Sequence, residues 1–439
     1  MAIAAEVGRS QVDILILSNG PGELSTWVRP VVAELRQRLP QARQSLILSP
    51  CPHASGQEAD MARQHLGFDR VQAPQHFTRY LLTGRTADRW DWHERGVVVF
   101  LGGDQFFALW IAKRLGYRVV IYAEWEARWQ RWVDAFGVRT TEIAECYGKK
   151  FPEKMTVVGD LLVDSVARSR GQIAGRGISH PRLLPADWQY RDDPQRRHYQ
   201  VALLPGSKPA KLTVATPMCL ATADCLRQAL PNCRFVIPVA PALTLDKLAT
   251  YARRTSNPVI DQVGGTTANL KRGRNGIAFI TEAKTDVSLW TDFPAHVLLS
   301  HCDVCVTTVG ANTAELGQLG VPMVVAIPLN KLDVMRAWDG PLGLLVNLPL
   351  VGTGIAKLVN WIAHRYLGLL AWPNRWAGEE IVPELRGYLT PQDIANVAQD
   401  ILTDPLRQKQ IRDRLRQWQG KPGAARKLVD LIQRQLEIL

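Results

Sequence analysis

Short runs of consecutive apolar residues, many of them β-branched, alternate along the chain with longer amphipathic stretches such as 23–39. The runs lie at 12–18, 45–49, 96–101 and 118–122, and again at 201–204, 234–239, 276–280, 304–308 and 323–327. Runs of this kind predict strands buried on both faces, as in a parallel sheet, and the stretches between them predict helices. The pattern therefore predicts an α/β fold with two doubly wound units.

The pattern stops near residue 170. Residues 169–199 are polar and arginine-rich, carry prolines and show no sustained periodicity, which is typical of a linker. We expect a Rossmann-like domain at 1–168, a second at 200–385, and helices at 386–439 that can pack back on the first domain. A length of 439 residues suits two domains of roughly 200 residues each. Because ligands bind beyond the carboxyl ends of the strands in such sheets, two facing domains should leave a cleft between them.

Basic residues exceed acidic ones by 53 to 41, and the formal net charge of +12 favours anionic partners. Nucleotide phosphates, an acidic membrane face and nucleic acid all fit that charge. The arginines are dispersed and no recognised nucleic-acid-binding module is present, so we expect no nucleic-acid partner.

The seven cysteines lack the spacing of a disulfide framework, which favours a reducing compartment. Cys302 and Cys305 have metal-like spacing, but they sit on an apolar run without a second pair, so we interpret them as small core residues. The first seven residues lack the basic flank and long apolar centre of a secretory signal. We therefore expect a cytoplasmic protein.

The segment 305–328 carries the most specific chemistry. It predicts a buried strand, a turn at Gly310, a helix, and a second buried strand opened by Pro322. The first turns of that helix carry Asn312, Thr313 and Glu315. A helix start offers free N–H groups and a positive dipole end to a phosphate, and a carboxylate one turn in can grip sugar hydroxyls.

Strand–turn–helix units are common in α/β proteins, so a second loop adds weight to the phosphate interpretation. The apolar run at 201–204 leads into Gly206, Ser207 and Lys208. A glycine there lets the backbone approach an anion, a hydroxyl donates to it, and Lys208 or Lys211 supplies positive charge. The two loops together predict a site for a nucleotide diphosphate.

The loop after the first strand, 18–25, only loosely resembles a dinucleotide fingerprint. Gly20 and Gly22 give the Gly-x-Gly spacing without a third glycine, and no acidic residue ends the second strand. We therefore reject a nicotinamide-dinucleotide site. A glycine-rich loop that admits a sugar or lipid headgroup close to the backbone remains the alternative.

Asp104 follows the apolar run 96–101 and precedes a helical stretch, at the sheet edge where chemistry occurs in this architecture. Asp is a favoured N-cap residue, so Asp104 can simply cap that helix. It can equally act as the general base that removes a proton from an acceptor hydroxyl.

Trp125, Trp129, Trp132 and Phe136 recur at spacings of four, three and four, which predicts one stripe of a helix. That stripe can pack on the sheet, or it can form an aromatic wall for an acyl chain or a sugar. Glu124 precedes the stripe and can line the cleft.

The region 341–372 is apolar and rich in Trp, but prolines and basic residues interrupt it, so it should not cross a bilayer. Its cations and tryptophans, with Arg375 and Trp376 just beyond it, suit a surface that lies on an anionic membrane. Core helices packing against the other domain explain the composition equally well.

Taken together, these motifs resemble the lipid-A-disaccharide synthase family of glycosyltransferases, in the family's order and over nearly the whole chain. The motifs are the loop 18–25, Gly102-Gly-Asp-Gln-Phe106, Val158-Gly-Asp-Leu-Leu-Val-Asp164, Leu204-Pro-Gly-Ser-Lys208, Gly310-Ala-Asn-Thr-Ala-Glu315 and Trp372-Pro-Asn-Arg-Trp-Ala-Gly-Glu-Glu-Ile-Val-Pro-Glu-Leu385. The last is the most specific.

The resemblance implies the two-domain GT-B fold, a UDP-sugar donor and a lipid or glycolipid acceptor. It places Asp104 on the family's proposed catalytic base. It also implies a nucleotide-sugar site made of Gly206, Ser207, Lys208, Gly310, Asn312, Thr313, Glu315, Asn374, Gly378 and Glu379. The corresponding acceptor site would comprise Asn19, Gly20, Gly22, Glu23, Glu124 and Trp125.

The chain also departs from the family pattern. Its first loop reads Pro21-Gly-Glu-Leu-Ser25 where the family usually carries Ser-Gly-Asp. Lys208 stands where arginine is usual, which keeps a point charge but loses a two-pronged phosphate clamp. Extra sequence lies near 170–200 and 255–292, so we interpret the chain as a divergent member whose acceptor need not be a lipid A precursor.

We hypothesise an inverting sugar transfer without a metal ion or other cofactor, by a peripheral protein on the inner face of the membrane that can form a homodimer. The alternatives are an enzyme like the UDP-sugar 2-epimerases, and a catalytically silent relative that binds a glycolipid or a partner protein.

Overall fold

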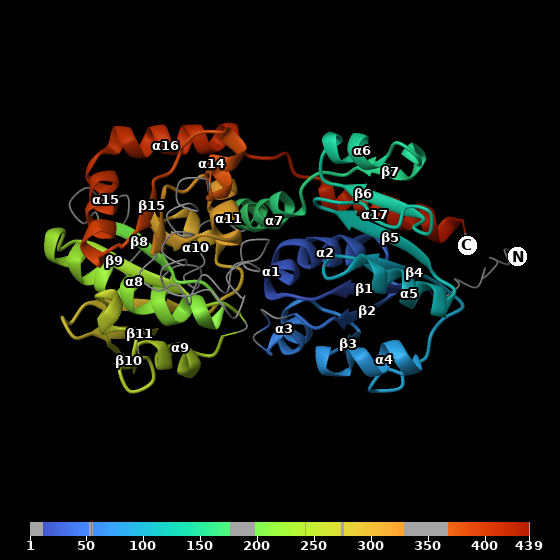
Figure 1. Cartoon of the computed structure of the whole chain (residues 1–439), viewed down its shortest axis with the longest axis horizontal. Coiled ribbons are helices and arrows are strands. Elements are labelled where there is room, and N and C mark those ends of the chain that lie inside the picture. Colours follow the sequence, from blue (N-terminus) through green and yellow to red (C-terminus); the bar gives the residue numbers. More distant parts are fainter. Residues whose placement is uncertain are drawn as a thin grey trace, which may run out of the picture. The chain divides into compact units, whose positions relative to one another are not determined.

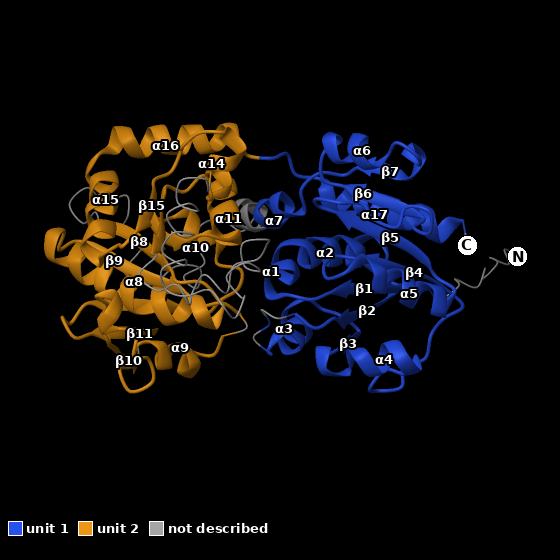
Figure 2. Ribbon diagram, viewed as in Figure 1, with its two compact units in different colours: residues 1–168, 420–439 blue, residues 169–419 orange. Residues whose placement is uncertain are grey.

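The computed structural model describes residues 12–51, 54, 56–175, 198–241, 243–273, 276–328 and 368–438, with the backbone alone for 169–175. The chain forms two compact units, one made of 1–168 with 420–439 and the other of 169–419 (Figure 2). The predicted membrane-facing segment 341–372 lies outside the described residues except for its last five positions. Every apolar run singled out from the sequence forms a strand, which confirms those predictions.

The first unit is built on a seven-stranded sheet in which all pairs are parallel. The strand order is β3-β2-β1-β4-β5-β6-β7. The strands are β1 Val12–Ser18, β2 Arg43–Leu48, β3 Arg70–Gln72, β4 Arg95–Phe100, β5 Arg118–Ala123, β6 Ala135–Val138 and β7 Met155–Val157. The sheet confirms the parallel arrangement expected from continuous apolar runs.

Both faces of this sheet are buried. Successive residues of a strand point to opposite faces, and Ile14 and Ile16 join one hydrophobic cluster while Leu15 and Leu17 join the other. The helices that cover the sheet are α2 Arg29–Arg38, α3 Glu58–His65, α4 Phe77–Thr83, α5 Gln105–Leu115, α6 Thr141–Tyr147 and α17 Ala424–Glu437 (Figure 1). Helix α7 spans Leu161–Gly175, and its first residue joins one of the two clusters. Full burial of one such Leu or Ile contributes roughly 2 kcal/mol.

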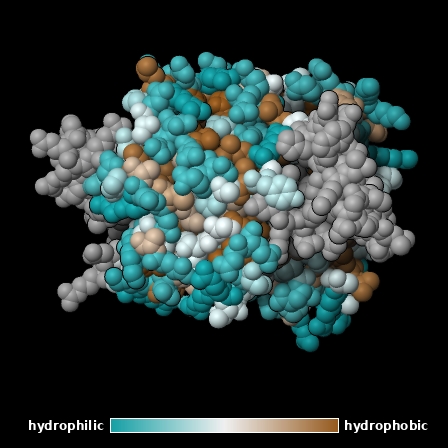
Figure 3. Space-filling view, turned by 60° about the vertical axis from the view of Figure 1, so that its left-hand side comes forward, coloured by the Kyte–Doolittle hydropathy of each residue, from teal (hydrophilic) through white to brown (hydrophobic). Residues whose placement is uncertain are grey.

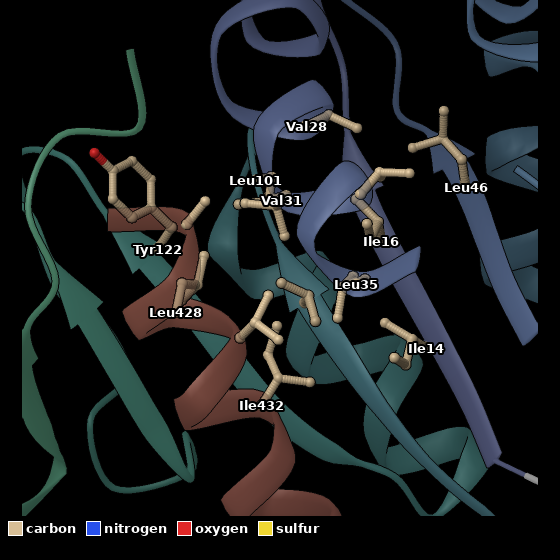
Figure 4. Close-up of a cluster of buried hydrophobic side chains, with 14 of the residues drawn as sticks. Ile14, Ile16, Val28, Val31, Leu35, Leu46, Leu101, Tyr122, Leu428 and Ile432 are labelled. Carbon is tan, nitrogen blue, oxygen red and sulfur yellow. The ribbon is translucent and has the colours of Figure 1, made fainter. Parts of the chain in front are cut away.

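The last helix of the chain belongs to the first unit. Leu428 and Ile432 of α17 point into the same cluster as Ile14 and Ile16 (Figure 4). The two carboxylate oxygens of Asp164 accept the backbone N–H groups of Gly423 and Ala425, both at 2.6 Å, and so satisfy donors at the start of α17. The preceding helices, α15 Pro391–Thr403 and α16 Pro405–Gln417, belong to the second unit.

The second unit contains an eight-stranded sheet of order β10-β11-β12-β9-β8-β13-β14-β15. Its strands are β8 Tyr199–Leu204, β9 Cys233–Pro238, β10 Ala268–Gly273, β11 Gly276–Thr281, β12 Asp286–Trp290, β13 Val304–Thr308, β14 Met323–Pro328 and β15 Glu384–Gly387. The sequence predicts a parallel sheet here too, and that is wrong for one edge, where β11 runs antiparallel to β10 and β12. The connections between these strands are too short for the crossover that parallel strands need.

The described helices of the second unit are α8 Pro209–Ala229, α9 Leu245–Tyr251, α10 His296–Ser300, α11 Ala311–Leu319, α14 Trp372–Ala377, α15 and α16. α8 packs against α15, and α11 packs against α14. On the face drawn in Figure 3, hydrophobic side chains lie among hydrophilic ones, as expected of an ordinary folded surface.

The predicted helix through Trp125, Trp129, Trp132 and Phe136 is wrong. Residues 124–134 form a loop, and Phe136 is fully buried in β6, where it pairs with Ile121 of β5. Trp129 has a φ of 62°, which a helix does not allow. Pairing between adjacent strands decided this segment, and the helix-like spacing was a coincidence.

The predicted helix 23–39 is interrupted. A short α1 at Pro21–Glu23 leads into a π-helical turn at Leu24–Val28 before α2 begins. The hydroxyls of Ser25 and Thr26 donate to the carbonyls four residues earlier, at 2.7 and 2.9 Å. Single π-turns of this kind are frequent at functional sites.

Candidate functional site

Each sheet contains a point where the connections of two neighbouring strands lead in opposite directions. In the second unit β8 continues to β9 on one side, while β13 continues to β14 on the other, so the reversal falls between the neighbours β8 and β13. Open α/β sheets bind ligands beyond the carboxyl ends of the strands at such a point. The loop 205–208 and the turn at Gly310, both predicted to hold phosphate, follow these two strands.

Lys211 joins the two loops. It lies in the first turn of α8, and its Nζ donates to the carbonyl oxygen of Val309 at 2.5 Å. A Cβ added at Gly310 would lie 3.3 Å from that Nζ, and a Cβ added at Gly206 would lie 3.6 Å from the Lys211 side chain. The sequence left open whether Lys208 or Lys211 provides the charge, and the structure shows Lys211 at the start of α11.

This arrangement brings two sources of positive charge together, the Lys211 ammonium and the start of α11. The N-terminus of α11 is the positive end of a helix dipole and also presents unpaired N–H groups. The Lys211 ammonium sits at that same end. An anion bound there would accept hydrogen bonds from both sources.

Gly310 occupies a position that favours a residue without a side chain. Its φ of 151° falls in the range that favours glycine, and it forms the N-cap of α11 without a capping side chain. Because no side chain occupies the cap position, the first N–H groups of α11 are left to water or to a ligand. Gly206, Ser207 and Lys208 are all half-buried in the facing loop.

The three predicted site residues of α11 differ in their surroundings. Thr313 is fully buried, and its hydroxyl donates to the Gly310 carbonyl at 2.9 Å and accepts the Trp372 N–H at 3.2 Å. It therefore fixes the turn and ties α11 to α14. Asn312 and Glu315 are half-buried on the first two turns, where a ligand at the helix start could reach them.

Asn374 organises the segment after α14. Its Oδ1 accepts the N–H groups of Ile381 and Val382, and its Nδ2 donates to the Val382 carbonyl and to the Glu384 carboxylate. The residue is fully buried. A direct contact of this amide with a nucleotide would require some of these bonds to break, so its evident role is to shape the segment.

The predicted partners of Asn374 lie nearer the surface. Gly378 ends α14 in the left-handed conformation, and the exposed Glu379 pairs with Arg414 of α16 at 2.5 Å. The segment is held against α11 because Gly317 lacks a side chain. A Cβ there would lie 2.7 Å from the Pro373 ring.

In the first unit the order reverses between β1 and β4, and the loops that follow these strands meet. A Cβ added at Gly102 would lie 2.9 Å from Asn19 Oδ1 and 3.1 Å from the Glu23 side chain. Asn19 Oδ1 also accepts the Gly20 N–H at 2.8 Å, and the Glu23 carboxylate folds back against Gly20. The structure therefore brings these three predicted acceptor residues together, with the half-buried Gly22 beside them.

Asp104 caps α5, as one of the two interpretations of the sequence holds. Its Oδ1 accepts the Phe106 N–H at 2.9 Å, and the side chain is 48% exposed. The Arg128 guanidinium lies 3.9 Å from the same oxygen. Capping leaves the carboxylate at the carboxyl edge of the sheet and open to solvent, so a role as base is compatible with this geometry.

Glu124 follows β5 at the same edge, in a group of charges. Burial raises the pKa of Glu124 to about 7, with the Arg139 guanidinium opposing the rise and the Asp160 carboxylate adding to it. Burial likewise raises the pKa of Asp160, against a hydrogen bond from the Leu162 N–H. Arg139 Nη1 lies 3.8 Å from Asp160 Oδ2. A carboxyl group that titrates near neutrality can take up or release a proton during a reaction.

Trp125 lies over this group. The Arg139 guanidinium stacks 4.0 Å from the centre of its ring, although the Trp125 residue remains 48% exposed. Sequence reasoning missed Arg139 because it follows β6, a strand hidden within the predicted helix. Asp160 was visible only as part of the Val158–Asp164 motif.

Within the described ranges, no three His, Cys, Asp or Glu side chains lie where they could hold a metal ion together. In the same ranges no helix is both long and apolar enough to cross a bilayer.

Comparison with curated proteins returns lipid-A-disaccharide synthases. A lipid-A-disaccharide synthase of Anaeromyxobacter sp. (strain K) is 26% identical over 236 residues, which cover 53% of this chain and 48% of that protein. The enzyme of the same name from Geobacter metallireducens is 24% identical over 335 residues, or 73% of this chain and 70% of that protein. The chain is similar to lipid-A-disaccharide synthases. The predicted resemblance is thereby confirmed, and identities this low fit a divergent member.

The similarity is partial. The first of these matches spans about half the length of the curated relative. No family model matches the chain.

Solved structures give the fold. A putative UDP-N-acetylglucosamine 2-epimerase from Listeria monocytogenes superimposes with a TM-score of 0.52 at 12% identity, covering 98% of this chain and 97% of that one. The UDP-N-acetylglucosamine 2-epimerase from Neisseria meningitidis, bound to its UDP-sugar, gives 0.51 at 12% identity over 97% and 100% of the two chains. These likenesses confirm the predicted GT-B class with two Rossmann-like domains. The cleft between the domains stays a prediction.

Proposed function

We propose that the protein is a glycosyltransferase that moves a sugar from a UDP-sugar to a lipid or glycolipid acceptor. The observation that carries the proposal is the pair of reversal points: a cationic, phosphate-type site in the second unit and a carboxylate-bearing edge in the first. The similarity to lipid-A-disaccharide synthases supports the donor and the type of transfer.

The donor binds through its diphosphate at the start of α11. The N–H groups after Gly310, the amides of Gly206 and Ser207, and the ammonium of Lys211 surround the β-phosphate, with Lys208 supplying a second charge. Glu315, one turn in, accepts hydrogen bonds from sugar hydroxyls. These groups stabilise the charge that grows on UDP as it leaves.

Transfer proceeds with inversion and without a metal ion. The acceptor oxygen attacks the anomeric carbon from the face opposite UDP, and the bond from that carbon to the β-phosphate oxygen breaks with its electron pair going to UDP. The acceptor proton passes to the carboxylate of Asp104. Lys211 and the helix dipole supply the charge compensation that a divalent cation supplies in other transferases.

The acceptor is a lipid-linked hydroxyl, and the protein works as a peripheral protein on the inner face of the membrane. The loop made by Asn19, Gly20, Gly22 and Glu23 receives the acceptor headgroup beside Asp104. The excess of basic residues supports contact with anionic lipid.

The experiment combines binding and turnover. We expect calorimetry to detect UDP binding, and UDP-N-acetylglucosamine with a membrane lipid extract to yield UDP and a glycosylated lipid seen by mass spectrometry. Release of a 2-epimer from the UDP-sugar alone would favour an epimerase instead. Glu124, whose pKa is raised to about 7, supports that alternative as a group able to exchange a proton with the sugar. No UDP binding at millimolar nucleotide would favour the catalytically silent relative.

A further inference from the structure

Four exposed aromatic side chains of the first unit form one continuous surface, which we call the aromatic surface: Phe106, Trp110, Trp129 and Trp132. They are 40%, 49%, 40% and 63% exposed. The ring centres of Phe106 and Trp110 lie 6.0 Å apart, those of Phe106 and Trp129 5.6 Å, and those of Trp129 and Trp132 6.0 Å. Each ring therefore contacts a neighbouring ring while about half of it faces water.

The loop that carries Trp129 and Trp132 is braced from beneath. The buried Gln105 side chain donates to the Glu126 carbonyl at 2.8 Å and accepts the Arg128 N–H at 2.9 Å. On the other side, the Lys154 ammonium donates to the carbonyls of residues 130 and 133 at 3.0 and 2.8 Å.

The backbone of this loop also holds an unusual conformation. Trp129 has a φ of 62°, in the left-handed region that bulky residues avoid. Such a conformation costs of order 1 kcal/mol or more and persists only where its surroundings enforce it, commonly at functional sites. The hydrogen bonds from Gln105 and Lys154 thus hold the loop in a conformation that exposes both tryptophans.

Basic side chains surround the rings. Lys113 and Arg114 follow Trp110 by three and four residues on α5, so they share its face of the helix, and both are exposed. Arg128 and Arg131 lie on the same loop as the tryptophans and are exposed as well. Two exposed carboxylates of this neighbourhood, Asp104 and Glu126, each lie within 4 Å of Arg128.

We propose that the aromatic surface docks the protein on an anionic lipid bilayer. Half-exposed indole rings suit headgroup depth, where one end of a ring is apolar and the other wet, and the four cations suit an acidic leaflet. A pocket for an acyl chain would instead cover the rings. The chain's net charge of +12 favours the same partner.

The aromatic surface lies close to Asp104, and its relevance to catalysis rests on the proposed function. The helix that begins at Asp104 is the one that carries Phe106 and Trp110. Trp110 follows Asp104 by six residues, a rise of about 9 Å along a helix. Docking through the aromatic surface would hold the proposed base within reach of lipid headgroups.

The test is sedimentation of the full chain with phosphatidylcholine vesicles, with and without phosphatidylglycerol, in the absence of any nucleotide. We expect binding that needs the anionic lipid. Combining Trp110→Ala with Trp132→Ala should weaken it about tenfold or more, because two partly inserted rings are lost. Arg131→Gln should weaken it about fivefold and lower its salt dependence.

Trp418→Ala is the matched control, since Trp418 is 43% exposed and belongs to the other unit. It should bind vesicles like the wild type. Equal binding by all variants, or no vesicle binding by the wild type, overturns the proposal. So does concentration-dependent self-association that the Trp110/Trp132 double variant abolishes while vesicle binding is unchanged, because the surface would then be an interface between two copies.

The proposed function is checked separately on the same proteins. The double variant should keep wild-type affinity for UDP and wild-type transfer to a short-chain, water-soluble acceptor, and lose transfer to acceptor lipid in vesicles. Vesicle binding without UDP binding would reject the proposed function and leave the docking surface intact. Full transfer to vesicle lipid by the double variant would reject the surface and leave the transferase intact.

Discussion

The Lys211 ammonium and the Val309 carbonyl are joined by a 2.5 Å hydrogen bond that places a cation at the start of α11. This contact connects two loops that lie about a hundred residues apart in the chain. It also gathers the ammonium and the positive end of the α11 dipole at one place, where both would attract an anion.

Removing the Lys211 charge tests the proposed phosphate site. We expect Lys211→Ala to weaken UDP binding roughly 10- to 100-fold, the effect of losing one charge-assisted hydrogen bond. Calorimetry with UDP measures it. Lys247→Ala removes an exposed lysine from α9 of the same unit and should leave UDP affinity unchanged. Equal affinity of the Lys211 variant and the wild type would place the diphosphate elsewhere.

Asp104 can be tested without disturbing the helix that it caps. Asparagine is as good an N-cap as aspartate, so Asp104→Asn keeps α5 intact while removing the basic carboxylate. We expect turnover to fall by about 100-fold or more with UDP affinity unchanged. Asp404→Asn is the control, because Asp404 caps α16 in the same way. Undiminished turnover of the Asp104 variant would leave that residue as a cap alone.

Glu124 should make stability depend on pH. Its pKa is raised to about 7 from an ordinary value of 4.5, so the folded state favours the protonated form. The stability that this preference contributes is fully present below about pH 4.5 and is lost as the pH rises through 7. Glu124→Gln removes this dependence, and we expect the variant to gain on the order of 2 kcal/mol relative to the wild type between pH 5 and pH 8. Thermal unfolding at the two pH values measures the difference. An equal change in stability of the wild type and the variant between pH 5 and pH 8 would contradict the raised pKa of Glu124.

Substituting Asn374 distinguishes a structural role of this residue from a role in nucleotide binding. Its amide makes four hydrogen bonds inside the second unit, so Asn374→Ala should destabilise that unit by about 3 kcal/mol or more. Urea unfolding gives the value. The exposed neighbour supplies the comparison, since Glu379→Ala should cost less than about 1 kcal/mol. Lost UDP affinity at unchanged stability would instead make Asn374 a ligand of the nucleotide.

Sequence patterns predicted the strands that matter most for the site, because a strand buried on both faces must be apolar throughout. That requirement made β1, β4, β8 and β13 visible, together with the glycine loops that follow them. The short edge strands β3, β7 and β15 carry too few apolar residues to be distinguished from loops.

The loop after β5 shows where a local pattern fails. Four aromatic residues at helical spacing predicted a helix, yet Phe136 belongs to a strand while Trp129 and Trp132 project into solvent. Pairing of β6 with β5, the Lys154 ammonium and the Gln105 side chain fix this segment, and all of these come from elsewhere in the chain.

The sequence by itself determined the two α/β units, the glycine loops after β8 and β13 and the position of Asp104, because each depends on residues close together in the chain. Tertiary structure decided that Lys211 reaches α11, that Asn374 is buried, and that Glu124 shares its surroundings with Arg139 and Asp160. The physical reason is distance along the chain. Local rules set where the backbone turns, whereas burial, charge and hydrogen-bond partners depend on strand order, which brings residues from distant segments to one edge of a sheet.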